Sequence, residues 1–531
     1  MSYRTAITPA RGSRKGQKIS HEGGVVFQVD PFTQLRRFLI LGSLSGSFYA
    51  SGHDLTKENL SIIDTCLRLD PVRTIDSIVE VSANTLAASN EPALVALAKA
   101  SAYGINDPSA RGAEAVRDRA LSALPQVART GTHLLHFVEY VSTLRGWGTV
   151  LRRHIGAWYL GKSPKNLAFQ VTKYQSRDGW SHKDVLRLVH PKAPDPVYDG
   201  IFNYVVNDRD MSKMTPGDVM SYLEAVNTTL SEQTDKAEVI RLIGQFNLPR
   251  EVINSKYLND PDVQAAMLPH MGIHALLRNL GNFSKSGLIT PLSDAERMVV
   301  DKLLISPGMR LHPVDVLKAQ RTYSAGRGMR GSGTWKVSQS IDARLNDLFY
   351  ESFKTIEPTG KKLYLAVDCS GSMSWQMDFA PNFSRRTAAA VLAMVTARTE
   401  DQFIVRGFND TMQHINIKPN DTLDRVEQEM ENVDWGWTRC ELPILEAMND
   451  GLDVDAFIIY TDSDTGYGEP VNQVFERYQQ QMGKPDSKFI VNAMVANDIS
   501  LADPDNPNML DVVGFSSDTP AVMSNFIRGL I

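Results

Sequence analysis

The sequence predicts a mixed α and α/β protein, with a helical domain followed by a domain built on a doubly wound parallel sheet. The chain has 531 residues, 42% of them hydrophobic, which is enough for two or more domains with separate cores. From about residue 31 to residue 345, apolar residues recur at helical spacing between Gly, Pro and Asn. After residue 361, short apolar runs alternate with helical stretches, a pattern typical of parallel sheets.

The N-terminal domain is predicted over residues 21–360, after a flexible basic arm at residues 1–20. One of its helices is expected over Asp235 to Phe246, where apolar residues recur at three-residue steps (Ala237, Ile240, Ile243 and Phe246). Another is expected after Ser293, because Ser293 and Glu296 have the spacing of a capping box. A long series of such helices suggests a helical-repeat array, in which each helix pair buries one face on the next pair.

The C-terminal domain is predicted over residues 361–531, after a turn at Ile356–Gly360. Five strands are expected, at Lys362–Val367, Gln402–Phe408, Ala456–Thr461, Lys488–Val495 and Val512–Phe515. Helices are expected between them at Arg385–Arg398, Glu441–Asn449 and Val471–Gln481. Ligands of such sheets bind at the carboxyl ends of the strands, so side chains at those ends are the candidate site.

Oxygen-bearing side chains lie at the ends of two of these strands and in one further loop. Asp368, Ser370 and Ser372 follow the first strand, Thr438 lies in a loop before a helix, and Asp462 ends the strand at 456–461. Carboxylate and hydroxyl oxygens suit a hard divalent cation, Mg²⁺ above all. The alternative is a vestigial site, or an acidic turn that only ties the loops together.

Charge is distributed unevenly between the two halves. Residues 1–360 hold 43 Lys and Arg against 35 Asp and Glu, a net of +8, and the remainder holds 13 against 26, a net of −13. Within the basic half, helical spacing would place Lys173 and Arg177 on one face, and Lys183, Arg187 and His190 on a face of the next helix. These cations would suit phosphates, or would simply be two solvated helix faces.

Several classes of protein are not indicated. Three cysteines are too few and too scattered for a disulfide framework or a zinc site and fit a reducing compartment. The first twenty residues are basic with no apolar core, and no apolar run spans a bilayer. We find no nucleophile elbow, Walker loop or clustered histidine site. The sequence therefore predicts a soluble cytoplasmic protein that is not an enzyme.

The ordered set formed by the D-x-S-x-S motif at Asp368, then Thr438, then Asp462 resembles the metal-ion-dependent adhesion site of von Willebrand factor A domains. The resemblance implies that a bound cation keeps an open position, which a carboxylate of a partner often fills. One departure is that Trp435 and Trp437 bracket the threonine, which leaves the metal geometry and any ligand preference open.

A second resemblance covers nearly the whole chain. The stretches Lys173–His190, Arg310–Pro313, Tyr323–Gly331 and Glu357–Lys361 look like the TROVE module of the Ro RNA-binding proteins. It implies a ring of HEAT-like helical repeats closed by a von Willebrand factor A domain. It also implies Y RNA on the outer basic surface of the ring, single-stranded 3′ ends of misfolded RNAs in its hole, and a role in RNA quality control.

The same resemblance assigns site residues and partners. Lys173, Arg177 and His190 fall where the family places key RNA-contacting residues, and bacterial members work with a 3′-to-5′ exoribonuclease such as polynucleotide phosphorylase. The main hypothesis is thus a noncatalytic RNA-binding protein. The alternative is a metal-dependent protein-binding adaptor that uses its A domain, with the helical half as scaffold.

Overall fold

The computed structural model describes residues 16–20, 23–41, 57–87, 89–105, 107, 110, 112–304, 311–328, 333–353, 357–377, 380–434, 436–466, 468–495, 499–515 and 519–530. These residues form two compact units. The helical unit comprises the described residues from 38 to 353. The α/β unit comprises residues 16–37 together with the described residues from 357 onward.

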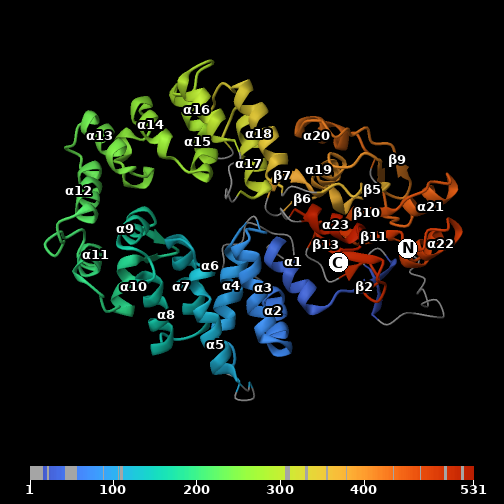
Figure 1. Cartoon of the computed structure of the whole chain (residues 1–531), viewed down its shortest axis with the longest axis horizontal. Helices are drawn as coiled ribbons and strands as arrows, with labels where there is room; N and C mark the ends of the chain where they lie inside the picture. The colour runs from blue at the N-terminus through green and yellow to red at the C-terminus, as the bar shows by residue number, and fades with distance from the viewer. Residues whose placement is uncertain are drawn as a thin grey trace, which may run out of the picture. The chain divides into compact units, whose positions relative to one another are not determined.

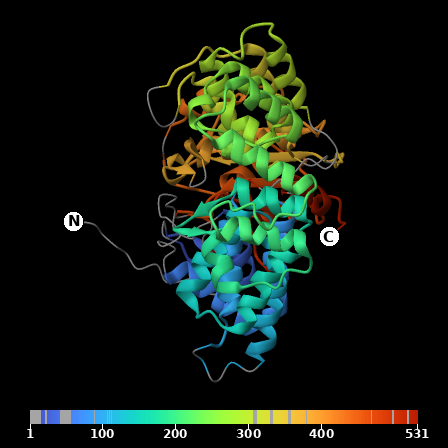
Figure 2. The same cartoon turned by 90° about the vertical axis from the view of Figure 1, so that its left-hand side faces the viewer.

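The helical unit is a succession of short helices that contact their neighbours in chain order. In Figure 2 its blue and cyan helices lie below the green ones, so order in space follows order in the chain. Its helices are α2 (Lys57–Leu69), α3 (Pro71–Ala83), α4 (Glu91–Ser101), α5 (Ala113–Ser122), α6 (Leu124–Val127), α7 (Gly131–Leu144), α8 (Thr149–Leu160), α9 (Pro164–Lys173), α10 (His182–Val189), α11 (Pro196–Val206), α12 (Asp218–Leu230), α13 (Lys236–Phe246), α14 (Pro261–Met267), α15 (Ile273–Ser286), α16 (Asp294–Lys302), α17 (Pro313–Ser324) and α18 (Gln339–Glu351), preceded by α1 (Pro31–Leu41), which leads in from the α/β unit.

Several of these helices begin with the dipeptide Asp-Pro. In α3, α11 and α14 the caps are Asp70, Asp195 and Asp260, and each side chain accepts a hydrogen bond from a backbone N–H of the first turn. Proline follows at the first helical position, where no N–H is needed and its fixed φ suits the helix. The short helices are therefore delimited locally by sequence.

Helix α13 confirms the predicted segment and corrects its predicted face. Asp235 is its N-cap residue, and the buried residues are Val239, Leu242 and Ile243. Ala237 is exposed. A strict three-residue step drifts around a helix of 3.6 residues per turn, so it does not follow the buried face.

The α/β unit contains a six-stranded sheet in the order β13-β11-β10-β5-β8-β9. Its strands are β5 (Leu363–Asp368), β8 (Phe403–Phe408), β9 (Met412–Gln413), β10 (Ala456–Thr461), β11 (Lys488–Ala493) and β13 (Met509–Val513). All neighbours pair in parallel except β8 and β9. The predicted doubly wound parallel sheet is confirmed, and β5 and β10 are its buried central pair.

Helices cover both faces of this sheet. Helix α19 (Arg385–Ala397) packs on β5 and β10, and all of its residues are buried. Helices α21 (Leu442–Asn449) and α22 (Val471–Gln481) contribute to a core with β5 and β10 in which Phe457 and Phe475 meet. Helices α20 (Leu423–Glu431) and α23 (Thr519–Ile527) complete the unit. Sheets buried on both faces require apolar strands, as seen here.

The first described residues belong to the α/β unit. Strands β1 (Gln17–Ile19) and β2 (Val25–Gln28) form a small sheet with β12 (Ile499–Ser500), near the other end of the chain. Residues 1–15 of the predicted arm lie outside the described residues, while residues 17–19 are strand. We expected the helical domain to begin at residue 21. In the structure, residues 16–37 belong to the α/β unit, because β1 and β2 pair with β12.

Among the described helices, no segment has both the length and the apolar character needed to cross a bilayer.

Candidate nucleic-acid interface and metal site

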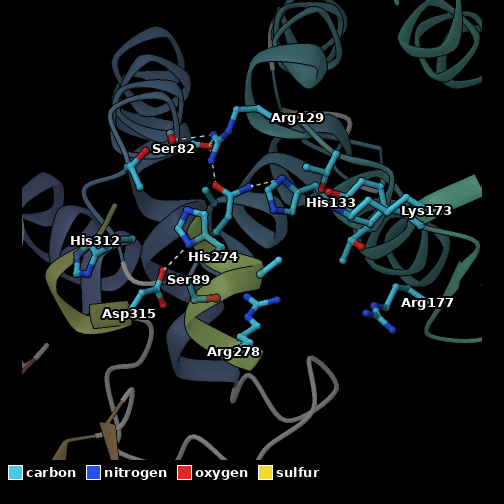
Figure 3. A pocket seen from close by; sticks show the side chains of 18 of the residues that line it. Ser82, Ser89, Arg129, His133, Lys173, Arg177, His274, Arg278, His312 and Asp315 are labelled. Atoms are coloured by element: carbon cyan, nitrogen blue, oxygen red, sulfur yellow. Dashed lines mark hydrogen bonds and ion pairs between the residues drawn. The ribbon is translucent and has the colours of Figure 1, made fainter. Parts of the chain in front are cut away.

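A cavity of about 780 Å³ opens among α3, α4, α7, α9, α15 and α17 of the helical unit. Four Lys and Arg side chains line it (Arg129, Lys173, Arg177 and Arg278), with two acidic ones (Glu251 and Asp315). Figure 3 shows these cations coming from different elements, with Arg278 on α15 and Lys173 at the end of α9. The charge of the lining is thus net positive, and the lining residues lie up to more than two hundred positions apart in the sequence.

Lys173 and Arg177 both line this cavity, although they do not share a helix. Helix α9 ends at Lys173, and Arg177 lies in the strand β3 (Ser176–Arg177) of a hairpin with β4 (Trp180–Ser181). The prediction of one helix face was therefore wrong. The turn of the hairpin is Asp178-Gly179, both with positive φ, which is the sequence typical of a two-residue hairpin loop.

The hairpin is held on α7 by its other side chains. Asp178 Oδ2 lies 2.5 Å from His136 Nδ1, and Trp180 Nε1 donates to Glu139 Oε2 at 2.9 Å. Trp180 also packs on Trp147, with ring centroids 5.8 Å apart. These contacts fix the hairpin, so Arg177 is presented to the cavity from a rigid support.

Lys173, Arg177 and Arg278 have no side-chain hydrogen bond or acidic ion-pair partner among the residues that the structure describes. Lys173 Nζ lies 5.2 Å from the centroid of the Phe169 ring, a cation–π contact that leaves its charge available. Burial raises the pKa of the adjacent Tyr174, with Glu251 adding to this effect and Arg278 opposing it. We call Lys173, Arg177 and Arg278 the cavity cations.

The other basic groups of the cavity are engaged or neutral. Arg129 Nη1 donates to Ser82 O at 2.7 Å, and His274 Nδ1 lies 3.4 Å from Asp315 Oδ2. Burial, with the charges of Arg129 and His136, lowers the pKa of His133 to about 4. His133 is therefore uncharged at neutral pH, and the cavity cations supply most of the attraction for an anion.

His190 is not among the residues that line the cavity. Helix α10 ends at Val189, and His190 caps it in the left-handed conformation with an exposed side chain. On α10, Lys183 Nζ bonds Asp208 Oδ1 at 2.6 Å, and Arg187 Nη2 donates to Val206 O at 3.2 Å. The predicted common face of Lys183, Arg187 and His190 is thus wrong, because His190 lies beyond the helix end. A capping box of Ser181 and Asp184 begins α10.

Arg278 was not anticipated from the sequence. It is an exposed residue of α15, whose buried face contains Leu276, Leu277 and Leu280. An exposed arginine on an amphipathic helix carries no local signal, since only the tertiary arrangement brings it into the cavity that Lys173 also lines.

In the α/β unit, the two predicted aspartates meet at the carboxyl edge of the sheet. Asp368 ends β5, and Asp462 follows its neighbour β10. Asp368 accepts hydrogen bonds from Thr461 Oγ1 at 2.5 Å and Ser370 N at 2.8 Å. Ser370 Oγ and Ser372 Oγ are 3.3 Å apart. Parallel pairing of β5 and β10 therefore brings these groups into one cluster, as the strand pattern predicted.

The loop of Thr438 lies beside both of these segments. Gly371 N donates to Gly436 O at 3.3 Å, and Gly466 N donates to Thr438 O at 2.6 Å. Thr438, Ser370 and Asp368 are fully buried. Among the described residues there is no group of three or more His, Cys, Asp and Glu that could hold a metal, so a cation here would depend on hydroxyl ligands beside the two carboxylates.

The chemistry of this donor set fits a divalent cation. Burial and the nearby Asp462 raise the pKa of Asp368, and burial likewise raises that of Asp462. Two buried carboxylates at one sheet edge disfavour each other's ionisation, and a divalent cation between them would remove that conflict.

Two exposed tryptophans lie on the loops of this cluster. Trp375, 68% exposed, comes three residues after Ser372, and Trp437, 67% exposed, directly precedes Thr438. The Arg385 guanidinium lies 5.7 Å from the Trp375 ring centroid. Trp435, the other predicted bracket, lies outside the described residues.

The chain matches known families and proteins along almost its full length. The TROVE domain matches residues 18–327, and the Ro60 vWA domain matches residues 362–527. An RNA-binding protein RO60 of Deinococcus radiodurans is 35% identical over 517 residues, covering 96% of this chain and 95% of that protein. An RNA-binding protein RO60 of Caenorhabditis elegans is 30% identical over 592 aligned positions, covering 98% and 91%. The crystal structure of the Ro protein of Deinococcus radiodurans matches with a TM-score of 0.69 and 33% identity, covering 94% of this chain and 100% of that one.

Proposed function

The chain belongs to the Ro family, in which a TROVE domain precedes a von Willebrand factor A domain, and we propose that it is a noncatalytic RNA-binding protein. Its relatives are named RNA-binding proteins, which supports a binding role rather than an enzymatic one. The observation that carries the proposal is the group of cavity cations, Lys173, Arg177 and Arg278, without acidic partners among the described residues of the helical unit.

The cavity suits single-stranded RNA. A flexible strand can follow cations spread over different helices and place its unpaired bases against lining side chains such as Tyr174. The attraction is mainly to phosphate and so is largely independent of sequence. We assign to the cavity the single-stranded 3′ ends of misfolded or structured RNAs, with a role in RNA quality control.

His190 is assigned to a different part of the same interface. Its exposed position at the end of α10, away from the cavity lining, suits the structured part of a bound RNA, such as a small noncoding Y RNA on the outer surface. A 3′-to-5′ exoribonuclease of the polynucleotide phosphorylase type is the partner that would act on RNA ends presented in this way.

The test is the affinity for a structured RNA with a single-stranded 3′ tail, titrated against salt. We expect wild type to bind with a steep salt dependence, and the Lys173→Ala/Arg177→Ala/His190→Ala variant to lose much of both affinity and slope. Equal binding by the two proteins would remove these residues from the interface. Absence of binding by wild type would contradict the RNA-binding function itself.

For the acidic edge we propose a Mg²⁺ site formed by Asp368, Ser370, Ser372, Thr438 and Asp462. We expect Mg²⁺ to raise the unfolding temperature of wild type. The free energy of unfolding should increase by about 2.7 kcal/mol when the Mg²⁺ concentration is 100-fold above the dissociation constant. In Asp368→Asn this increase should vanish. In EDTA the variant should be at least as stable as wild type, because it has one buried carboxylate fewer beside Asp462. Thermal unfolding with Mg²⁺ or EDTA measures both effects.

Asp401→Asn is the matched control for this metal experiment, because Asp401 is an exposed carboxylate of the same unit. It should respond to Mg²⁺ as wild type does. An equal Mg²⁺ effect in Asp368→Asn, or no effect in wild type, would contradict the site.

A second function is favoured by Trp375 and Trp437, which present apolar surface beside the proposed cation. A partner protein with a carboxylate flanked by apolar residues would fit both features. In this function the A domain is a metal-dependent adaptor, and binding of such a partner should be lost in EDTA and in Asp368→Asn.

A further inference from the structure

A second pocket of about 450 Å³ lies in the helical unit, beside the cavity described above. Its lining comes from α9, α10, α11 and α12. Gln175 lines both hollows, so the start of the β3–β4 hairpin separates them. The volume is within the range of pockets that hold small ligands.

The floor and the rim of this pocket differ in chemistry. Apolar surface comes from Val171, Val205, Val226 and the ring of Tyr204. Tyr204 OH donates a hydrogen bond to Asn227 Oδ1 at 2.9 Å. Lys183 and Arg209 supply two positive charges and Asp208 supplies one negative charge, so apolar surface meets a net positive edge. This combination matches a nucleotide, which has a flat base and an anionic phosphate.

The charge at the edge is available to an outside ligand. Lys183 is paired with Asp208, but the side chain of Asp208 is 81% exposed, and an ion pair this open to water is weak and easily exchanged. Arg209 has neither a side-chain hydrogen bond nor an ion pair to any residue within the described part of the chain. A phosphate would therefore find two cations without a strong competing contact.

The backbone holds Asp208 and Arg209 in an unusual conformation. Their φ angles are 53° and 71°, in the left-handed region that non-glycine residues seldom adopt. Arg209 N donates to Tyr204 O at 2.7 Å, which ties this turn to the end of α11. Strained positions of this kind persist where the surrounding structure fixes them, often at ligand sites.

We propose that this pocket is a nucleotide subsite of the RNA interface, holding one unpaired base of a bound strand on its floor and the adjoining phosphate at Arg209 and Lys183. The inference rests on the proposed RNA-binding function. It adds a path for the RNA, from the cavity cations across Gln175 to the second pocket. The start of α10, at His182 and Lys183, lines this part of the path.

The test compares a short oligo(U) with an abasic oligonucleotide of equal length, using full-length protein. Arg209→Gln removes the phosphate contact, so both ligands should bind about three- to tenfold more weakly, with a salt slope smaller by about 0.7. Val205→Phe fills the pocket without changing charge, so it should weaken oligo(U) and spare the abasic ligand. Arg297→Gln, an exposed arginine paired with Asp294 on α16, is the charge-matched control.

The outcomes separate this inference from the function on which it rests. Failure of wild type to bind oligo(U) contradicts RNA binding as a whole. If wild type binds and neither Arg209→Gln nor Val205→Phe changes the affinity, the subsite is overturned and the function stands. An effect of Arg209→Gln alone, with Val205→Phe like wild type in affinity and thermal stability, also overturns it, because the base then lies outside the pocket.

Discussion

Replacing Arg37 with methionine is expected to destabilise the α/β unit by about 3–5 kcal/mol, because it leaves a largely buried carboxylate without its partner. Arg37 is fully buried, and its Nη2 donates to both carboxylate oxygens of Asp511, at 2.8 and 2.7 Å. Its Nη1 donates to Ile499 O at 2.9 Å. The side chain thus joins α1 to β12 and β13, across 474 positions of sequence.

Denaturant unfolding of the full chain, with hydrogen exchange of residues 499–513 as the local measurement, tests this expectation. Arg37→Met should accelerate exchange in β12 and β13. The double variant Arg37→Met/Asp511→Asn should recover part of the loss, because neither partner then leaves a buried charge unpaired. Ser500 Oγ donates to Asp511 Oδ2 at 2.5 Å, and asparagine can still accept that bond. A single variant as stable as wild type would show that the bridge contributes little.

Residues 16–37 also contact the loop beside the proposed metal site. Ser20 Oγ and Gly24 N donate to Thr465 O, at 2.6 and 2.8 Å, and the next residue, Gly466, bonds Thr438 O. A Cβ on Gly24 would lie 2.5 Å from the carbonyl oxygens of Thr465 and Gly466, so the close approach requires glycine. Loss of the Arg37 anchor is therefore expected to loosen the loop beside Thr438 as well.

The α/β fold was predictable because its signals are local. Buried parallel strands are continuous apolar runs, and the five predicted ones correspond to β5, β8, β10, β11 and β13. Asp368 and Asp462 follow neighbouring strands, so parallel pairing was sufficient to place them together. The contribution of β1 and β2 was not predictable in this way, since they pair with β12 from the opposite end of the chain.

The helical unit was predictable as a class and less so in detail. Helix starts have clear signals, such as Asp195-Pro196 for α11 and Ser181 for α10. Helix ends are weaker, and reading α9 past Lys173 concealed a hairpin whose Asp178-Gly179 turn was visible in the sequence. The cavity depends on tertiary packing, which brings Arg278 into the same lining as Lys173, about a hundred residues earlier in the chain. No rule of sequence spacing predicts that the two residues line one cavity.

Removing all three cavity cations, in Lys173→Gln/Arg177→Gln/Arg278→Gln, is expected to weaken binding of a short single-stranded oligonucleotide on the order of 100-fold or more. Hydrogen bonds to charged groups contribute on the order of 1.5–3 kcal/mol each. These side chains have no acidic partner among the described residues, so RNA does not have to replace an internal ion pair. The slope of log affinity against log salt should fall by about 2, because each single-strand phosphate contact contributes about 0.7. Fluorescence anisotropy over a series of salt concentrations measures both quantities.

Two matched proteins make this result specific to the cavity. Lys236→Gln/Arg241→Gln/Arg297→Gln removes the same charge from exposed ion pairs elsewhere on the helical unit, so a general loss of positive charge would affect it equally. His190→Ala should bind the short oligonucleotide like wild type and lose affinity only for an RNA with a structured portion, because His190 lies outside the cavity lining. If His190→Ala and the cavity variant lost affinity for both ligands in the same proportion, the two parts would be one undivided surface, and the assignment of single strands to the cavity would be wrong.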